Sequence, residues 1–202
     1  MKNSEKPRRS ESFWFATSVV LLVITVGVLQ GVVVAIAVAG VQMLARTSRP
    51  HDAVVGRIPG TSAFLDTETH PEAETFAALL IYRFDASLVF FNADHFKARA
   101  RAAALHAPAP KRYFLLDAET IPFLDTTGAA SLDELCGNLE DQGIALAIAA
   151  AKSPVRAMLD RTGLTSRIGP GRMFHTVELA VESLLKDMPQ AETALISAKE
   201  RC

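Results

Sequence analysis

The stretch RYFLLDAETIPFLDTTG, residues 112–128, decides how the larger part of this chain folds. It begins with a short apolar run, which is typical of a buried strand, and Asp117 ends that run. A loop follows. Asp125-Thr126-Thr127-Gly128 then opens a helix that we expect to end near Gln142, just before Gly143. The stretch therefore predicts a strand, a loop and a helix in immediate succession.

The same succession of strand and helix occurs on both sides of this stretch. Apolar runs predict strands at 79–84, 88–91, 112–116, 144–150 and 173–174, and Val54-Val55 are compatible with one more short strand. Helical spacing and capping residues predict helices at 92–105, 125–142, 153–163 and 176–186. Because buried strands alternate with helices, we expect an α/β fold in which helices pack on a mostly parallel β-sheet.

Residues 13–44 form an apolar run of 32 residues without a charged side chain. A signal-peptide core needs only about 7–15 apolar residues, so the run predicts attachment to a membrane instead. One straight helix of this length would measure roughly 48 Å, whereas the hydrocarbon core is about 30 Å thick. The run is therefore either one strongly tilted helix or two short helices that form a hairpin or re-entrant pair, with a break at Gln30-Gly31. Basic residues on both flanks favour the hairpin, with both ends in the cytoplasm.

These features divide the chain into a cytoplasmic lead-in (1–12), a membrane helical hairpin (13–45), a connector (46–75), an α/β domain (76–188) and a flexible tail (189–202). The net charge of −1 gives no basic surplus, so we expect no nucleic acid as a partner. Neither cysteine and none of the five histidines has a neighbour at metal-ligand spacing. We therefore predict no metal site and no cofactor.

The candidate functional residues are Asp125, Thr126, Thr127 and Gly128 at the helix start, with Asp117 at the strand end. Loops that follow strand carboxyl ends form the ligand sites of α/β proteins, and a helix N-terminus favours an anion. There the hydroxyl of Thr126 or Thr127 could contact an anion or carry a phosphoryl group, beside free N–H groups of Gly128 and the two alanines after it. The alternative is structural: Asp125 caps the helix and Asp117 tethers the loop.

No catalytic constellation accompanies these residues. The chain has no nucleophile elbow, no histidine next to a serine and no phosphate-binding loop. We therefore predict no catalytic residues, and a binding or regulatory module in place of an enzyme.

The corner at residues 125–128 resembles that of a STAS domain, the fold of bacterial anti-sigma-factor antagonists and of the cytoplasmic tails of SulP-type anion permeases. The signature of the family is Asp-Ser/Thr-Ser/Thr-Gly, and this chain has Asp-Thr-Thr-Gly. Further segments resemble the permease branch, and together they extend the resemblance from about residue 11 to 186: Phe13-Trp14, Gln30-Gly31, 48–51, 55–61, 82–86, 90–93 and 161–164.

The resemblance implies the C-terminal portion of a SulP-type sulfate or anion transporter, in which the last short membrane helices precede a STAS domain with an assembly or regulatory role. Implied partners are membrane lipid, the remaining transporter helices, a second copy of the transporter and a regulatory protein at the STAS surface. The implied location is the inner (plasma) membrane, with the STAS domain in the cytoplasm. The family's anion site is expected among helices outside this chain, which would then be a truncated permease product, a split-gene subunit or a tail with its own regulatory role.

Two other functions stay open. The chain could be a free-standing, membrane-tethered signalling module that resembles the antagonists and is switched at Thr126 or Thr127. In the antagonists the phosphoacceptor is a serine, whereas both residues are threonine here. The third function is binding of a small anion or nucleotide at the same helix start.

Overall fold

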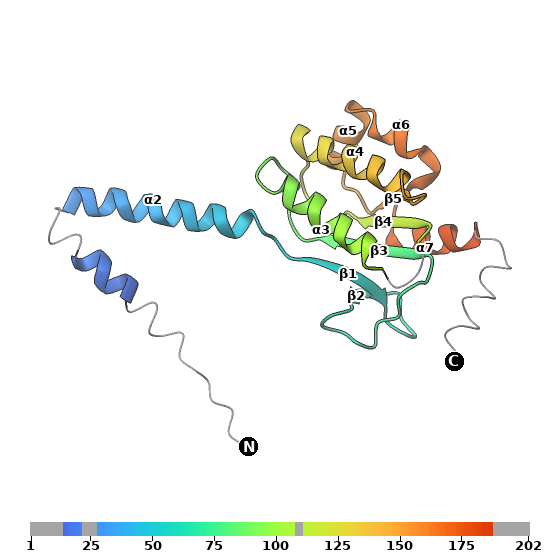
Figure 1. Cartoon of the computed structure of the whole chain (residues 1–202), viewed down its shortest axis with the longest axis horizontal. Helices are drawn as coiled ribbons and strands as arrows, with labels where there is room; N and C mark the ends of the chain where they lie inside the picture. Colours follow the sequence, from blue (N-terminus) through green and yellow to red (C-terminus); the bar gives the residue numbers. More distant parts are fainter. Residues whose placement is uncertain (1–13, 22–27, 108–110, 188–202) are drawn as a thin grey trace, which may run out of the picture. The chain divides into compact units, whose positions relative to one another are not determined.

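The computed structural model describes residues 14–21, 28–107 and 111–187 (Figure 1). Two compact units, Met1–Thr47 and Ser48–Cys202, make up the chain. The first contains a helix over residues 14–21 and the helix α2 (Val28–Thr47), and most described side chains on both are apolar and exposed. Among the residues that the structure describes, no helix has both the length and the apolar character that crossing a membrane requires.

The predicted break in the apolar run is not at Gln30-Gly31, because α2 continues through both residues. Alanine and valine make up half of this helix, and the glycine at position 31 costs too little to interrupt it. Residues 22–27, between the two helical segments, lie outside the described residues, as do the whole of the predicted lead-in and the whole of the predicted tail. The hairpin and the spanning of a membrane stay predictions.

In its described part, the second unit contains a six-stranded sheet with the order β2-β1-β3-β4-β5-β6. The four strands from β3 to β6 pair in parallel, and β1 pairs antiparallel with both of its neighbours. This arrangement confirms the predicted α/β fold with a mostly parallel sheet. The strands are β1 (Asp52–Arg57), β2 (Phe64–Asp66), β3 (Leu79–Phe84), β4 (Tyr113–Asp117), β5 (Ala145–Ala149) and β6 (Met173–Phe174).

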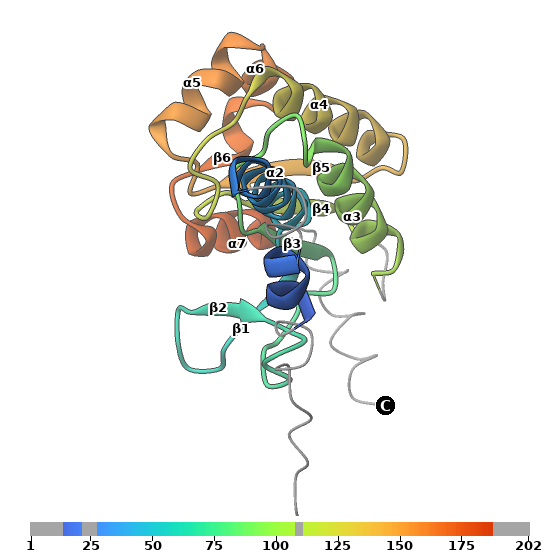
Figure 2. The ribbon, with the colours of Figure 1, turned by 90° about the vertical axis from the view of Figure 1, so that its left-hand side faces the viewer.

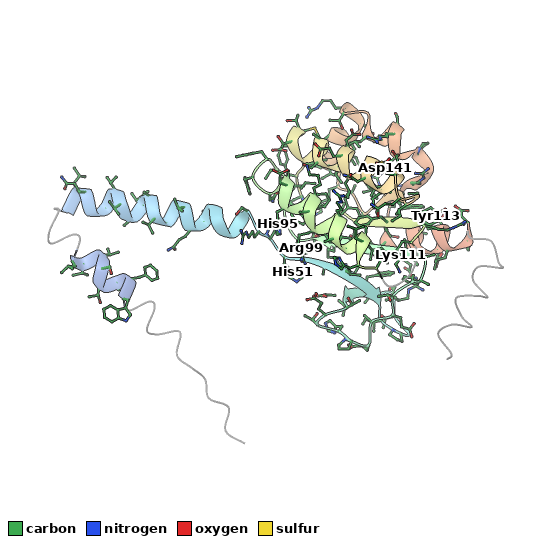
Figure 3. The ribbon with its side chains drawn as sticks, viewed as in Figure 1. His51, His95, Arg99, Lys111, Tyr113 and Asp141 are labelled. Carbon is green, nitrogen blue, oxygen red and sulfur yellow. The ribbon has the colours of Figure 1, made fainter. Side chains whose placement is uncertain are left out.

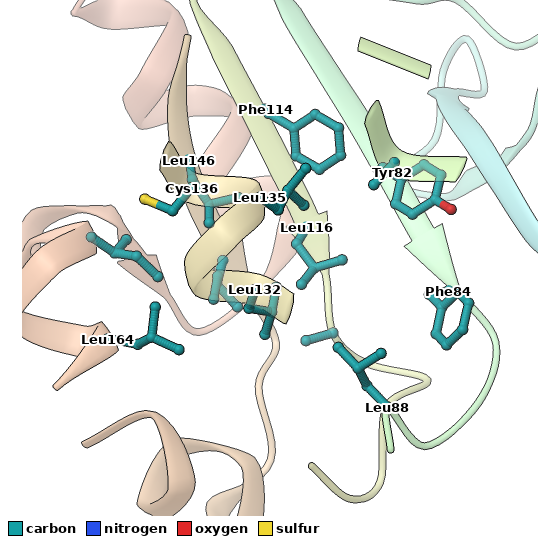
Figure 4. Close-up of a cluster of buried hydrophobic side chains, with 14 of the residues drawn as sticks. Tyr82, Phe84, Leu88, Phe114, Leu116, Leu132, Leu135, Cys136, Leu146 and Leu164 are labelled. Atoms are coloured by element: carbon teal, nitrogen blue, oxygen red, sulfur yellow. The ribbon is translucent and has the colours of Figure 1, made fainter. Parts of the chain in front are cut away.

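Helices cover both faces of the sheet (Figure 2). One face carries α3 (Ala93–Leu105), α4 (Thr126–Glu140), α5 (Ser153–Arg161) and α6 (Leu164–Ile168), and the other face carries α7 (Val177–Lys186). The strands divide their side chains between the two cores: on β3, Tyr82 and Phe84 pack under α3 and α4, whereas Leu79 and Ile81 pack against the α7 face. Figure 4 shows the larger core, in which Phe114, Leu116 and Leu146 lie beneath α4.

Three segments differ from the sequence prediction. Residues 88–91 form no strand, because the chain turns after one bridge between Leu88 and Leu124, and the side chain of Asn92 binds back to Ser87 and Val89. The predicted connector contributes β1 and β2 to the sheet. Beyond Gly163, the chain forms the short helix α6 and a 3-10 turn (Pro170–Arg172) before β6.

Replacing Phe96 with alanine tests the larger core. This ring is fully buried and lies edge-on to Tyr82 and Phe84, with centroid distances of 6.1 and 5.2 Å. We expect Phe96→Ala to lower the free energy of unfolding by about 3–5 kcal/mol. The matched control is Phe90→Ala, since that ring is 70% exposed and its loss should change stability by about 0.5 kcal/mol or less. Urea unfolding of the full chain in detergent, followed by circular dichroism, measures both, and equal losses would contradict this packing.

Candidate functional site

The carboxylate of Asp125 binds two segments of backbone that lie far apart in the sequence. Asp125 is the N-cap of α4, and its Oδ1 accepts a hydrogen bond from the N–H of Gly128 at 2.7 Å. Its Oδ2 accepts a hydrogen bond from the N–H of Phe90 at 2.9 Å, in the loop between β3 and α3. The predicted capping role of Asp125 is therefore confirmed, and the same side chain also fixes the neighbouring loop.

Gly128 lies where two backbone segments approach each other more closely than a side chain would allow. A Cβ atom at this position would stand 2.3 Å from the carbonyl oxygen of Leu88. That carbonyl also accepts a hydrogen bond from the N–H of Asp125, and the N–H of Leu88 donates to the carbonyl of Phe123. The glycine of the corner is thus required by the contact between the two loops, whatever the corner binds.

The two threonines of the corner are exposed to solvent, and no hydrogen bond of their hydroxyl groups is found within the described residues. The expectation of free N–H groups farther along was wrong, because Gly128 donates to the Asp125 carboxylate and Ala129 to the Asp125 carbonyl. Ala130 is far enough into α4 to bond within the helix. An anion at this corner would therefore meet Thr126 and Thr127 themselves, not the residues that follow them.

Asp117 takes no direct part in the corner. It is fully buried at the end of β4, where register places it beside Arg83 of β3, and the Arg83 Nε donates to its Oδ2 at 2.8 Å. Its Oδ1 accepts a hydrogen bond from the N–H of Glu119 at 3.1 Å. Asp117 thus tethers the following loop, as predicted, but it also forms an ion pair with the partly buried Arg83 that nothing in the local sequence indicated.

Another group of charged residues joins β1 to α3, where Figure 3 labels His51, His95 and Arg99 close together. The Nε of Arg99 donates to both carboxylate oxygens of Asp52 at 3.0 Å, and the Nδ1 of His51 lies 2.9 Å from Oδ2 of Asp85. Burial and the nearby Asp52 raise the pKa of Tyr82, whose hydroxyl is enclosed. Sequence reasoning missed this group because its members come from distant segments.

The sequence profile of the STAS domain family matches residues 66–180. The chain belongs to the STAS domain family. A probable sulfate transporter of Mycobacterium tuberculosis is 35% identical to the chain over 176 residues, which are 87% of the chain and 31% of the relative. The high affinity sulfate transporter 1 of Stylosanthes hamata is 28% identical over 159 residues, which are 75% of the chain and 24% of the relative.

Solved structures show the same fold. The murine Solute Carrier 26 family member A9 anion transporter, in its inward-facing state, superimposes with a TM-score of 0.67 at 18% identity, over 75% of this chain and 25% of that one. The STAS chain thus spans about a third or less of the length of the relatives it matches. Only 26 of its 202 residues can lie outside the Mycobacterium match, so that match must include nearly all of α2 as well as the STAS sheet.

Gly128→Ala tests the close approach at the STAS corner. Since the new Cβ would collide with a backbone carbonyl, we expect a loss of about 3 kcal/mol or more in the free energy of unfolding. Gly171→Ala is the matched control, because a Cβ there meets no atom within 4 Å and should change stability by about 0.5 kcal/mol or less. Urea unfolding of the full chain in detergent measures both, and a stable Gly128→Ala variant would show that the two loops can separate.

Proposed function

We propose that this chain is the C-terminal part, or a separate subunit, of a SulP-type sulfate or anion transporter, and that its STAS domain assembles or regulates that transporter. The observation that carries the proposal is that a probable sulfate transporter matches 87% of the chain, a share too large to leave out α2. A signalling STAS protein would not need the apolar part of that match. The anion pathway itself would lie in helices that other parts of the transporter supply.

The exposed apolar surface of the first unit supports the inference that this unit belongs to a membrane-embedded assembly. Large apolar side chains are exposed along both helical segments, including Trp14, Leu29, Ile36, Val41 and Met43. Exposed apolar surface of this extent marks a region that lipid or other protein covers. We infer that membrane lipid and the remaining transporter helices cover it, in the plasma membrane and with the STAS domain in the cytoplasm. A second copy of the transporter is a further inferred partner.

The proposed role of the STAS domain is binding and regulation, not catalysis. In the described ranges, no three histidine, cysteine, aspartate or glutamate side chains gather as a metal ion would require. The exposed loop residues Phe90 and Phe123 and the exposed hydroxyls of Thr126 and Thr127 surround one corner. That corner is where we infer that a regulatory protein docks, and a phosphoryl group on either threonine would change its charge by about −1.5 to −2.

A chimera tests the transport proposal. This chain would replace the matching part of the Mycobacterium tuberculosis relative, and uptake of labelled sulfate would be measured in a host that lacks sulfate transport. We expect uptake by the chimera, and none by this chain alone or by the relative without the matching part. The control chimera carries Gly171→Ala, where a new Cβ meets no atom within 4 Å, and it should take up sulfate as the unmodified chimera does.

Two results would contradict the proposal. Equal uptake by the relative without its matching part would mean that the STAS portion has no role in assembly or regulation. A chimera that reaches the membrane with a folded STAS domain and still fails to take up sulfate would mean that this chain does not belong to such a transporter.

A further inference from the structure

A cavity of about 1040 Å³ opens at the edge of the sheet where the parallel strands have their carboxyl ends. It is lined by the side chains of Arg83, Lys152, Arg156 and His175, among others from the β2, β5 and β6 ends. None of the candidate residues, Asp117 included, lines this cavity. Arg83 does line it, and its guanidinium pairs with Asp117. Its volume is that of a small-molecule site, typically about 300–1000 Å³.

The connections of the sheet explain why a cavity forms at this place. The chain leaves β5 toward α5 on one face, whereas it leaves the adjacent β6 toward α7 on the other face. Neighbouring strands whose connections leave to opposite faces open a crevice at their carboxyl ends, and such crevices are where open α/β sheets bind ligands. At this point Ala150 has a φ of +55°, which turns the chain sharply out of β5.

Arg156 is the best-placed cation of the cavity. Its Nε donates to the carbonyl of Ala151 at 2.9 Å and one Nη to the carbonyl of Phe174 at 3.3 Å, so the guanidinium is held between the ends of β5 and β6. No carboxylate pairs with it in the part of the chain that the structure describes. An arginine fixed by neutral carbonyls keeps its full charge and has donors left for a ligand.

Lys152 and the starts of two helices add to this positive character. The amine of Lys152 is exposed and has no hydrogen-bond or ion-pair partner among the described residues. No side chain caps the start of α5, and at α7 the hydroxyl of Thr176 accepts only the N–H of Leu179. Pro154 has no N–H, so α5 offers the N–H groups of Ser153 and Val155, and α7 offers those of Val177 and Glu178, without an intrahelical acceptor at the cavity.

Carboxylates limit what the cavity can accept. Glu119 and Glu178 also line it, and both are exposed, whereas Asp117 is already paired with Arg83. The two glutamates would repel a ligand that carries several phosphates, whereas one compact anionic group can contact Arg156 and Lys152. The charges therefore favour a single oxyanion group over a polyanion.

We propose that this cavity binds a tetrahedral oxyanion, sulfate or phosphate, either free or as the single phosphate group of a small metabolite. Arg156 and Lys152 supply the charge, and the first turns of α5 and α7 supply N–H donors. The proposal does not depend on the transport function, because binding is a property of the STAS cavity in this chain alone. If the cavity failed to bind an oxyanion, the transport proposal would stand, and if transport failed, binding in the cavity could still be measured.

Isothermal titration calorimetry on the full chain in detergent tests the site. Sodium sulfate, sodium phosphate and adenosine 5′-monophosphate are the three probes, at an ionic strength kept constant with sodium chloride. We expect saturable binding to one site, weakened about tenfold or more by Arg156→Gln, which removes a charge-assisted hydrogen bond. Saturation by sulfate and phosphate alone identifies a free anion as the ligand, whereas tighter binding of the nucleotide identifies a phosphate ester.

Two further variants keep the test decisive. The exposed side chain of Lys152 bonds to no other described residue, so Lys152→Gln should leave the melting temperature unchanged. It should weaken binding of the anion severalfold, and this result stays informative even where Arg156→Gln impairs folding. Arg101→Gln, an exposed arginine on α3 that does not line the cavity, should bind as the unmodified chain does. The absence of saturable binding of all three probes would overturn the proposal, and so would unchanged affinity in both cavity variants.

Discussion

One carboxylate organises the corner of this STAS domain, and the position of two loops depends on it. Asp125 accepts a hydrogen bond from Gly128 in its own helix and another from Phe90, which is 35 residues earlier in the chain. A cap alone is worth about 1 kcal/mol. The second bond gives Asp125 a larger role, because it holds the loop after β3 against the start of α4. It can do so only because Gly128 lets the carbonyl of Leu88 come close.

The sequence predicted what local chemistry determines. The strands β3, β4 and β5 consist mostly of apolar residues, and α4 begins directly after its cap Asp125 and ends before Gly143, whose φ is +71°. The apolar strands and the ends of α4 can both be read from the local sequence, without knowing which distant residues they contact. The unpredicted elements depend on contacts with other segments. β2 has three residues and exists because β1 pairs with it, and residues 88–91 are held by the bridge from Leu88 to Leu124 and by the bond from Phe90 to Asp125.

The candidate site was predicted only in part, again because local residue types can be read from the sequence and contacts with other segments cannot. The residue types of the corner identified Asp125 as a cap and Asp117 as a loop tether, and both roles are present. The ion-pair partner of Asp117 is Arg83, which lies 34 residues earlier on another strand. The cavity between β5 and β6 was missed, because it depends on which faces of the sheet α5 and α7 cover. No single segment of the sequence carries that information.

The two outermost strands of the sheet are very short. At one border β2 has three residues, and at the other β6 has two. A long, exposed border strand offers unpaired N–H and C=O groups to any other extended chain, and short ones remove most of that opportunity. A second copy of this domain, or an extended peptide, would find a ladder of only two or three residues on either side. Association of the domain with itself or with other proteins therefore has to use side-chain surfaces of helices and loops, and the sheet is protected against fibre-like stacking.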